Sequence, residues 1–131
     1  MLRVLIVEDE KPIREMLNDF LTDEGYDTLM AENGQRGVEI ARVERPDLVL
    51  MDVMLPLLNG FAAMRALKDD PETQTIPVIV MSANSALLYT QEGKLADQMI
   101  RKPFDLDELL RLIQSRIGIS AHGGYAAALP G

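Results

Sequence analysis

"VLIVEDEKP", residues 4–12, places four apolar residues directly before three acidic ones. A short, unbroken apolar run that ends at polar residues is typical of a strand buried on both faces of a parallel sheet. The acidic residues Glu8, Asp9 and Glu10 then fall where that strand ends, with no basic residue among them. The group that balances their charge must therefore come from a distant part of the chain or from solution.

Four more short apolar runs follow, at residues 28–31, 48–51 and 78–81 and, more weakly, at 98–101. The intervals between them have the length and the three-and-four apolar spacing of amphipathic helices, as at residues 13–21, 34–43 and 106–117. Pro12 suits a first helical turn, Gly25 a helix exit, and Asp105 an N-cap. The alternation predicts an α/β fold: a doubly wound parallel sheet of five strands, with five helices covering both faces.

The chain has 131 residues, of which 47% are hydrophobic, and this predicts one globular domain. We expect the domain to span residues 1–118 and residues 119–131, rich in Gly and Ala, to form a flexible tail. No apolar run is long enough for a membrane span or a signal peptide, which predicts a cytoplasmic protein without membrane insertion.

The charge and the residue types present restrict the possible functions. A net charge of −8 argues against a nucleic-acid partner, because a nucleic-acid surface needs clustered Lys and Arg. With no cysteine and a single histidine, His122 in the predicted tail, the chain offers neither thiolate nor multi-imidazole metal ligands. Oxygen ligands remain, so the expected partners are metal cations and other proteins.

Polar residues follow four of the five predicted strands at the strand end. Glu8 and Asp9 follow the first, Asp52 the third, Ser82 the fourth and Lys102 the fifth. Ligands of open parallel sheets bind beyond the carboxyl ends of the strands. If the first and third strands are neighbours, three carboxylates meet in one cleft.

Three close carboxylates repel one another, by on the order of 4 kcal/mol for a pair about 4 Å apart at an effective dielectric constant near 20. An oxygen-only site of this kind suits Mg²⁺, which keeps several waters and shares its shell with a substrate phosphate. Glu8 and Asp9 would hold the ion, and Asp52 could act as a nucleophile on phosphorus. Lys102 would supply a cation for the phosphoryl oxygens and Ser82 a hydroxyl donor.

Four motifs in this order resemble the receiver domain of two-component response regulators: "VEDE" at 7–10, "DVMLPLLNG" at 52–60, "MSA" at 81–83 and "KPF" at 102–104. The resemblance covers residues 2–117 approximately. It implies a flavodoxin-like receiver fold with strand order 2-1-3-4-5. It also makes the Lys102–Pro103 bond a candidate for a cis peptide.

The resemblance also implies roles for single residues. Asp52 becomes the phosphoacceptor, and Glu8, Asp9, Asp52 and the backbone carbonyl of Met54 become Mg²⁺ ligands. Ser82 and Lys102 become the pair that binds the phosphoryl group and relays its presence. Met99 stands where most receivers have Tyr or Phe, so we expect Met99 to be a weak relay and the backbone of residues 84–96 to carry the signal.

The resulting expectation is a single-domain response regulator. It accepts a phosphoryl group from a sensor histidine kinase or a phosphotransfer protein and switches a surface read by a downstream protein. Such a protein catalyses its own phosphorylation and dephosphorylation and is no metabolic enzyme.

Less specific interpretations stay open for each residue taken alone. Glu8, Asp9 and Glu10 suit a solvated loop before a helix, and Ser82 suits an N-cap. Lys102 suits an exposed surface, and Asn59–Gly60 a turn.

Other functions also stay open for the whole chain. A phosphohydrolase of the haloacid-dehalogenase type needs a second Asp two residues after the nucleophile, where this chain has Met54. A nucleotide- or flavin-binding domain needs a Gly-rich loop where Glu8–Glu10 lie. A degenerate receiver would bind partners without phosphorylation.

Overall fold

A computed structural model describes residues 2–53, 59–83 and 93–118 of the chain. In these residues strands and helices alternate as the sequence predicts. The elements are β1 (Arg3–Val7), α1 (Lys11–Asp23), β2 (Asp27–Ala31), α2 (Gly34–Glu44), β3 (Leu48–Asp52), α3 (Gly60–Asp69), β4 (Val78–Ser82), η1 (Gly93–Leu95, a 3₁₀ turn), β5 (Gln98–Arg101) and α5 (Leu106–Ile117).

The strands form one parallel sheet in the order β2-β1-β3-β4-β5, which confirms the predicted topology. In register, Val7 of β1 lies opposite Met51 of β3 and Ala31 of β2. The carboxyl ends of β1 and β3 are therefore neighbours at the centre of the sheet. The residues that follow these strands start from adjacent positions.

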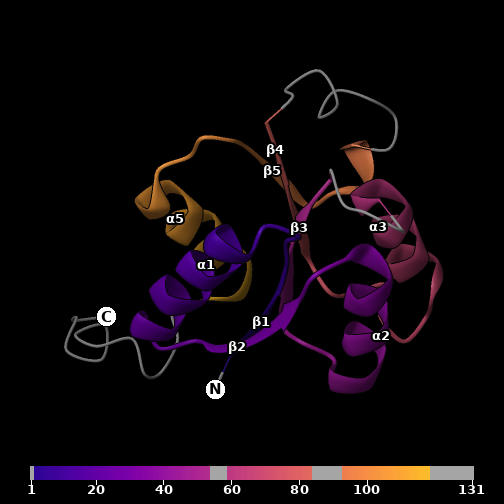
Figure 1. Ribbon diagram of the computed structural model, residues 1–131. Coiled ribbons are helices and arrows are strands. Elements are labelled where there is room, and N and C mark those ends of the chain that lie inside the picture. The colour runs from indigo at the N-terminus through magenta and orange to yellow at the C-terminus, as the bar shows by residue number, and fades with distance from the viewer. Residues whose placement is uncertain (1, 54–58, 84–92, 119–131) are drawn as a thin grey trace.

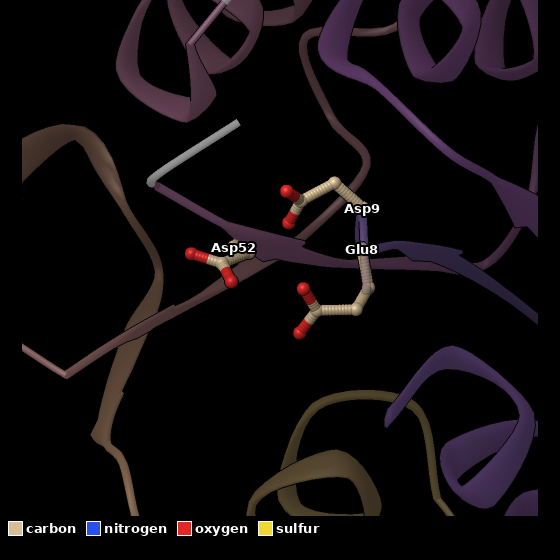
Figure 2. A group of neighbouring side chains, drawn as sticks. All are labelled: Glu8, Asp9 and Asp52. Atoms are coloured by element: carbon tan, nitrogen blue, oxygen red, sulfur yellow. The ribbon is translucent and has the colours of Figure 1, made fainter. Parts of the chain in front are cut away.

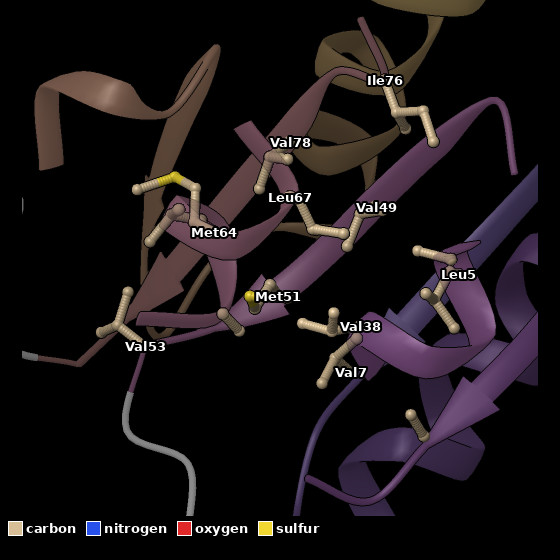
Figure 3. Packing of buried hydrophobic residues seen from close by; sticks show 14 residues of the cluster. Leu5, Val7, Val38, Val49, Met51, Val53, Met64, Leu67, Ile76 and Val78 are labelled. Atoms are coloured by element: carbon tan, nitrogen blue, oxygen red, sulfur yellow. The ribbon is translucent and has the colours of Figure 1, made fainter. Parts of the chain in front are cut away.

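The sheet separates two helical layers, with α1 and α5 on one face and α2 and α3 on the other (Figure 1). Alternate residues of each strand point to opposite faces. Leu5 and Val7 join a buried cluster with Leu67 of α3, seen in Figure 3, whereas Val4 and Ile6 join the cluster of α1 and α5. Burial on both faces explains why the strands read as continuous apolar runs.

The helix boundaries follow the local signals in the sequence. The side chain of Asp105 accepts a hydrogen bond from the Asp107 N–H at 3.0 Å, which confirms it as the N-cap of α5. Asn33 and Asn59 cap α2 and α3 in the same way. Gly25 follows α1 with φ = 93°, a left-handed conformation that glycine adopts without strain.

A half-buried ion pair closes the amino-terminal edge of the sheet. The Lys68 ammonium, near the end of α3, lies 2.9 Å from a carboxylate oxygen of Asp97, just before β5. Lys68 also donates to the carbonyl of Ile76 at 3.0 Å, and Asp97 accepts the N–H of Val78 at 2.7 Å. The pair therefore ties α3 to the starts of β4 and β5.

The structure corrects some predicted boundaries and leaves other predictions untested. Strands β3 and β4 each extend one residue further than predicted, to Asp52 and Ser82, because these polar residues still pair in the sheet. Met54, residues 84–92 of the expected fourth helix and the predicted tail at 119–131 lie outside the described residues. No helix in the described ranges is long and apolar enough to cross a membrane.

Candidate functional site

Three carboxylates meet at the carboxyl edge of the sheet, at the ends of its two central strands. Glu8 and Asp9 follow β1, and Asp52 is the last residue of β3. One carboxylate oxygen from each lies within 4.8 Å of the others, and Figure 2 shows the three side chains turned toward a common space. Glu8 is fully buried, which is not the environment of a solvated loop, whereas Asp9 is exposed.

Lys102 lies between two of these acids. Its ammonium is 2.7 Å from a carboxylate oxygen of Glu8 and 2.7 Å from one of Asp52. Only 17% of the side chain is exposed, so the interpretation of Lys102 as an ordinary surface lysine is wrong. Lys102 pairs with two of the three acids, and Asp9 lies beside them, so the three carboxylates outnumber this one lysine.

The backbone just beyond β5 holds Lys102 beside the end of β4. The Lys102 N–H donates to the carbonyl of Ser82 at 2.8 Å, just beyond the β4–β5 ladder. The Lys102–Pro103 peptide bond is cis, which confirms that prediction. Ser82 is itself fully buried at the end of β4. Ser82 at the end of β4 and Lys102 directly after β5 thus lie side by side at the edge that carries the acids.

Burial dominates the electrostatics of the cluster. It raises the pKa of the Glu8 carboxyl from 4.5 to about 7, against the opposing effect of the Lys102 hydrogen bond, and the Asp52 charge raises it further. Burial alone would lower the pKa of Lys102, but the hydrogen bonds to Asp52 and Glu8 outweigh it and raise that pKa. A proton, the Lys102 ammonium and any added cation therefore compete for the carboxylate oxygens of Glu8 and Asp52.

Gly60, the first residue of α3, packs against the backbone of Asp52 and Val53. This contact requires glycine more strictly than the turn predicted from the Asn59–Gly60 sequence does. A Cβ at this position would lie 2.3 Å from the carbonyl oxygen of Asp52 and 2.4 Å from the Cα of Val53. The Gly60 N–H donates to the Val53 carbonyl at 3.1 Å. Only glycine lets the start of α3 approach the backbone of Asp52 this closely. Sequence spacing alone does not reveal that contact.

The carboxylates open into a cleft of about 250 Å³, lined by Asp9, Glu10, Ile13, Asp52, Ala83 and Lys102. An apolar groove of about 320 Å³ adjoins it, lined by Ile13, Met16, Ala83, Lys102, Pro103 and Phe104. The two share Ile13, Ala83 and Lys102 at their common rim. A molecule that reaches Asp52 from this side contacts the groove.

Met99 lies away from the acids, in the middle of edge strand β5, with 39% of its surface exposed.

Arg14, which no sequence motif marked, lies close to the cluster. Its guanidinium donates to the carbonyl of Glu8 at 2.8 Å and to that of Asp9 at 3.3 Å. No motif marks Arg14, because both contacts are to backbone atoms.

The donor set fits Mg²⁺. Three carboxylates with ligand oxygens within 4.8 Å offer the hard oxygen ligands that this ion prefers, and the adjoining cleft has room for waters and a phosphate oxygen. The single lysine leaves negative charge that a divalent cation would neutralise. We therefore treat Glu8, Asp9 and Asp52 as candidate ligands.

Comparison with known proteins agrees with this architecture. The family model described as the response regulator receiver domain matches residues 4–114. The chain is 42% identical over 117 residues to protein PilH of Pseudomonas aeruginosa, covering 88% of this chain and 97% of PilH. It is 35% identical over 122 residues to sporulation initiation phosphotransferase F of Bacillus subtilis, covering 92% and 97%.

A solved structure gives the same result. Response regulator TrrA of Thermotoga maritima, in complex with Mg²⁺ and BeF, superposes with a TM-score of 0.82 at 30% identity, covering 88% of this chain and 98% of TrrA. The chain therefore belongs to the response regulator receiver domain family of two-component signalling.

Proposed function

We propose that this protein is a single-domain response regulator that is phosphorylated on Asp52 in the presence of Mg²⁺. The observation that carries the proposal is the meeting of Glu8, Asp9 and Asp52 at the sheet edge, with Lys102 paired to Glu8 and Asp52. The nearly complete coverage of PilH and phosphotransferase F supports the single-domain assignment. Family membership argues against a haloacid-dehalogenase phosphohydrolase. The cytoplasmic location stays a prediction.

The transfer step uses Asp52 as the nucleophile. A carboxylate oxygen of Asp52 forms a bond to phosphorus while the P–N bond of a donor phosphohistidine breaks, and the imidazole nitrogen keeps the electron pair. Glu8, Asp9 and Asp52 would hold the Mg²⁺ ion, with the Met54 carbonyl as the further ligand that the family resemblance implies, and the ion would supply positive charge for the transferring phosphoryl oxygens.

Lys102 and Ser82 act on the product. The ammonium already lies 2.7 Å from Asp52, so it needs little movement to pair with the new phosphoryl oxygens. The carboxylate loses its own negative charge on forming the acyl phosphate and the phosphoryl group brings about two, so this edge of the sheet gains about one negative charge. The Ser82 hydroxyl donates a hydrogen bond to the phosphoryl group. Met99 follows the conformational change that phosphorylation causes. A downstream protein reads the altered surface.

The expected donor is a sensor histidine kinase or a phosphotransfer protein. Ile13, Ala83 and Lys102 line both the cleft at Asp52 and the apolar groove, so the groove adjoins the site at which a donor delivers the phosphoryl group. A protein donor can bury that groove while it delivers the phosphoryl group, whereas a small donor cannot.

A labelling experiment tests the proposal. The protein is incubated with a small acyl phosphate, with Mg²⁺ or with EDTA, and its mass is measured. We expect a base-labile gain of one phosphoryl group, only with Mg²⁺, on the peptide that contains Asp52. A panel of purified phosphorylated kinases then identifies the donor. A chain that stays unlabelled by every donor would be a degenerate receiver.

A further inference from the structure

The first turn of α1 differs from the starts of the other helices. Side chains of Asn33, Asn59 and Asp105 cap α2, α3 and α5, but Glu10, the N-cap of α1, makes no side-chain capping hydrogen bond. Glu10 also belongs to the turn that carries Glu8 and Asp9. The turn that places two candidate metal ligands therefore lacks the usual restraint of a capping side chain.

Arg14 supplies a different restraint. One nitrogen of its guanidinium, Nη1, donates to the carbonyl oxygen of Glu8 at 2.8 Å and to that of Asp9 at 3.3 Å. The strand pairing of β1 ends at Val7, with one further bond from the Glu8 N–H to the Ala31 carbonyl at 3.1 Å. The carbonyls of Glu8 and Asp9 therefore lie where the chain leaves the sheet. Arg14 thus joins the first turn of α1 back to the end of β1.

The contacts of Arg14 are to main-chain atoms and not to the carboxylates. Among the ion pairs of the described residues, none involves Arg14, although three acids lie on the same turn. The guanidinium therefore restrains the backbone of Glu8 and Asp9 and leaves their carboxylates turned toward Asp52, as in Figure 2.

We propose that Arg14 is a positioning residue for the acidic cluster: it fixes the β1–α1 turn so that Glu8 and Asp9 face Asp52 before any cation binds. The inference rests on the proposed function, since it concerns the same site. Its physical basis is preorganisation, because a ligand set that is already ordered loses less conformational freedom on binding. Partners that orient metal ligands are typically worth 10- to 100-fold in metal affinity.

Charge and positioning predict opposite effects, which makes the proposal testable. Arg14→Met keeps a long side chain but removes the positive charge and both hydrogen bonds. Loss of a nearby positive charge alone should tighten Mg²⁺ binding. Loss of positioning should weaken it. We expect Mg²⁺ affinity, measured by calorimetry on the full chain, to fall about tenfold.

Lys11→Met is the matched control. Lys11 lies in the same turn, its side chain is 73% exposed, and its one ion pair within the described residues is with Glu15 at 3.9 Å. This variant removes one positive charge and leaves the Arg14 contacts in place. We expect its Mg²⁺ affinity to stay the same or to rise. Arg14→Lys, which keeps the charge but loses the planar donor group, should give an intermediate loss.

Amide exchange in metal-free protein gives a second readout. In Arg14→Met, the amides of Asp9, Glu10 and Lys11 should exchange faster than in the parent, with no change in the central strands. Unchanged exchange together with unchanged or tighter Mg²⁺ binding overturns the proposal. If Arg14→Met does not fold, Arg14→Lys decides the question by the same two measurements.

The outcomes also separate this proposal from the proposed function. A parent protein that binds no Mg²⁺ refutes the proposed function, and the metal-free exchange measurement still decides whether Arg14 fixes the turn. A parent that binds Mg²⁺ no more tightly than Arg14→Met, with the same amide exchange in the turn, refutes the positioning role and leaves the proposed function in place.

Discussion

Two half-buried lysines at opposite edges of the sheet differ in the charge around them. Lys68 is 19% exposed and pairs with Asp97, whose remaining contacts include the N–H of Val78. Lys102 is 17% exposed but contacts two acids, and Asp9 lies beside them as a third. The Lys68 pair is electrically balanced, whereas the Lys102 cluster is not.

The difference separates a structural ion pair from a reactive one. At the Lys68 edge, burial alone would raise the pKa of Asp97, but Lys68 and the backbone N–H of Val78 outweigh it and lower that pKa. At the Lys102 edge, burial raises the pKa of Glu8 to about 7. A balanced pair stabilises the fold, and an unbalanced cluster is stabilised by adding a cation or a proton.

The same substitution at the two edges should have unrelated effects. Asp52→Asn should abolish phosphoryl labelling and leave the fold intact, because the change is nearly isosteric and removes only the nucleophilic oxygen and its charge. Asp97→Asn should keep labelling but lose about 1–2 kcal/mol of stability. Mass spectrometry and urea unfolding measure the two effects. Undiminished labelling of Asp52→Asn would end the assignment of Asp52.

Stability should depend on pH with opposite sign at the two edges of the metal-free protein. The raised pKa of Glu8 gives a contribution that is complete below about pH 4.5 and is lost as pH rises through 7, on the order of 3 kcal/mol in all. The lowered pKa of Asp97 gives a contribution that is present above 3.8 and is lost as pH falls.

Urea unfolding of the parent, Glu8→Gln and Asp97→Asn across this range separates the two contributions. The parent should lose stability relative to Glu8→Gln between pH 4.5 and 7. The parent should keep a higher free energy of unfolding than Asp97→Asn at these pH values, and this difference should disappear only below about pH 3.8. Parallel curves for all three proteins would refute the predicted difference.

Replacing each lysine by methionine should also distinguish the edges. Lys68→Met leaves Asp97 half-buried without its cation and should cost about 2 kcal/mol, with no recovery on adding Mg²⁺. Lys102→Met should also be destabilised, but Mg²⁺ should restore it, since the ion takes the oxygens that Lys102 released. Thermal unfolding with Mg²⁺ and with EDTA measures this. A full Mg²⁺ rescue of Lys68→Met would contradict the comparison.

The smallest effect is expected at Asp9, the exposed acid that Lys102 does not contact. Asp9→Asn removes one repulsive charge, so the metal-free protein should gain about 1 kcal/mol. Mg²⁺ binding should weaken at the same time. Melting temperature in EDTA and calorimetry with Mg²⁺ measure the two changes. A metal-free variant that melts below the parent would show that Asp9 is not repelled by its neighbours.

The fold was predictable because each element carries a local signal. Strands buried on both faces appear as apolar runs, and Asp105 and Gly25 mark helix ends by their own backbone chemistry. The predicted third and fourth strands ended one residue too early, before Asp52 and Ser82. A polar residue can still pair in a sheet, and an apolar pattern does not include it.

The candidate site was less accessible to prediction wherever it depends on contacts across the fold. Strand-end spacing brings Glu8, Asp9 and Asp52 to one edge, and the structure has them there. Lys102 contacts acids that are 94 and 50 positions away in the sequence. The approach of Gly60 to the Asp52 backbone and the carbonyl contacts of Arg14 join residues that are close in sequence. Those contacts depend on register and packing, which no single residue type encodes.

The two-layer core constrains how the chain can accept mutations. Leu5 and Ile6 are adjacent in sequence, yet they belong to clusters on opposite faces of the sheet. A volume lost at Leu5 can be refilled only by a second change in its own cluster, such as on α2, the helix that packs against β1, and never by one at Ile6. Compensating mutations in descendants of this chain should therefore pair positions far apart in the gene, while neighbouring codons within a strand vary independently.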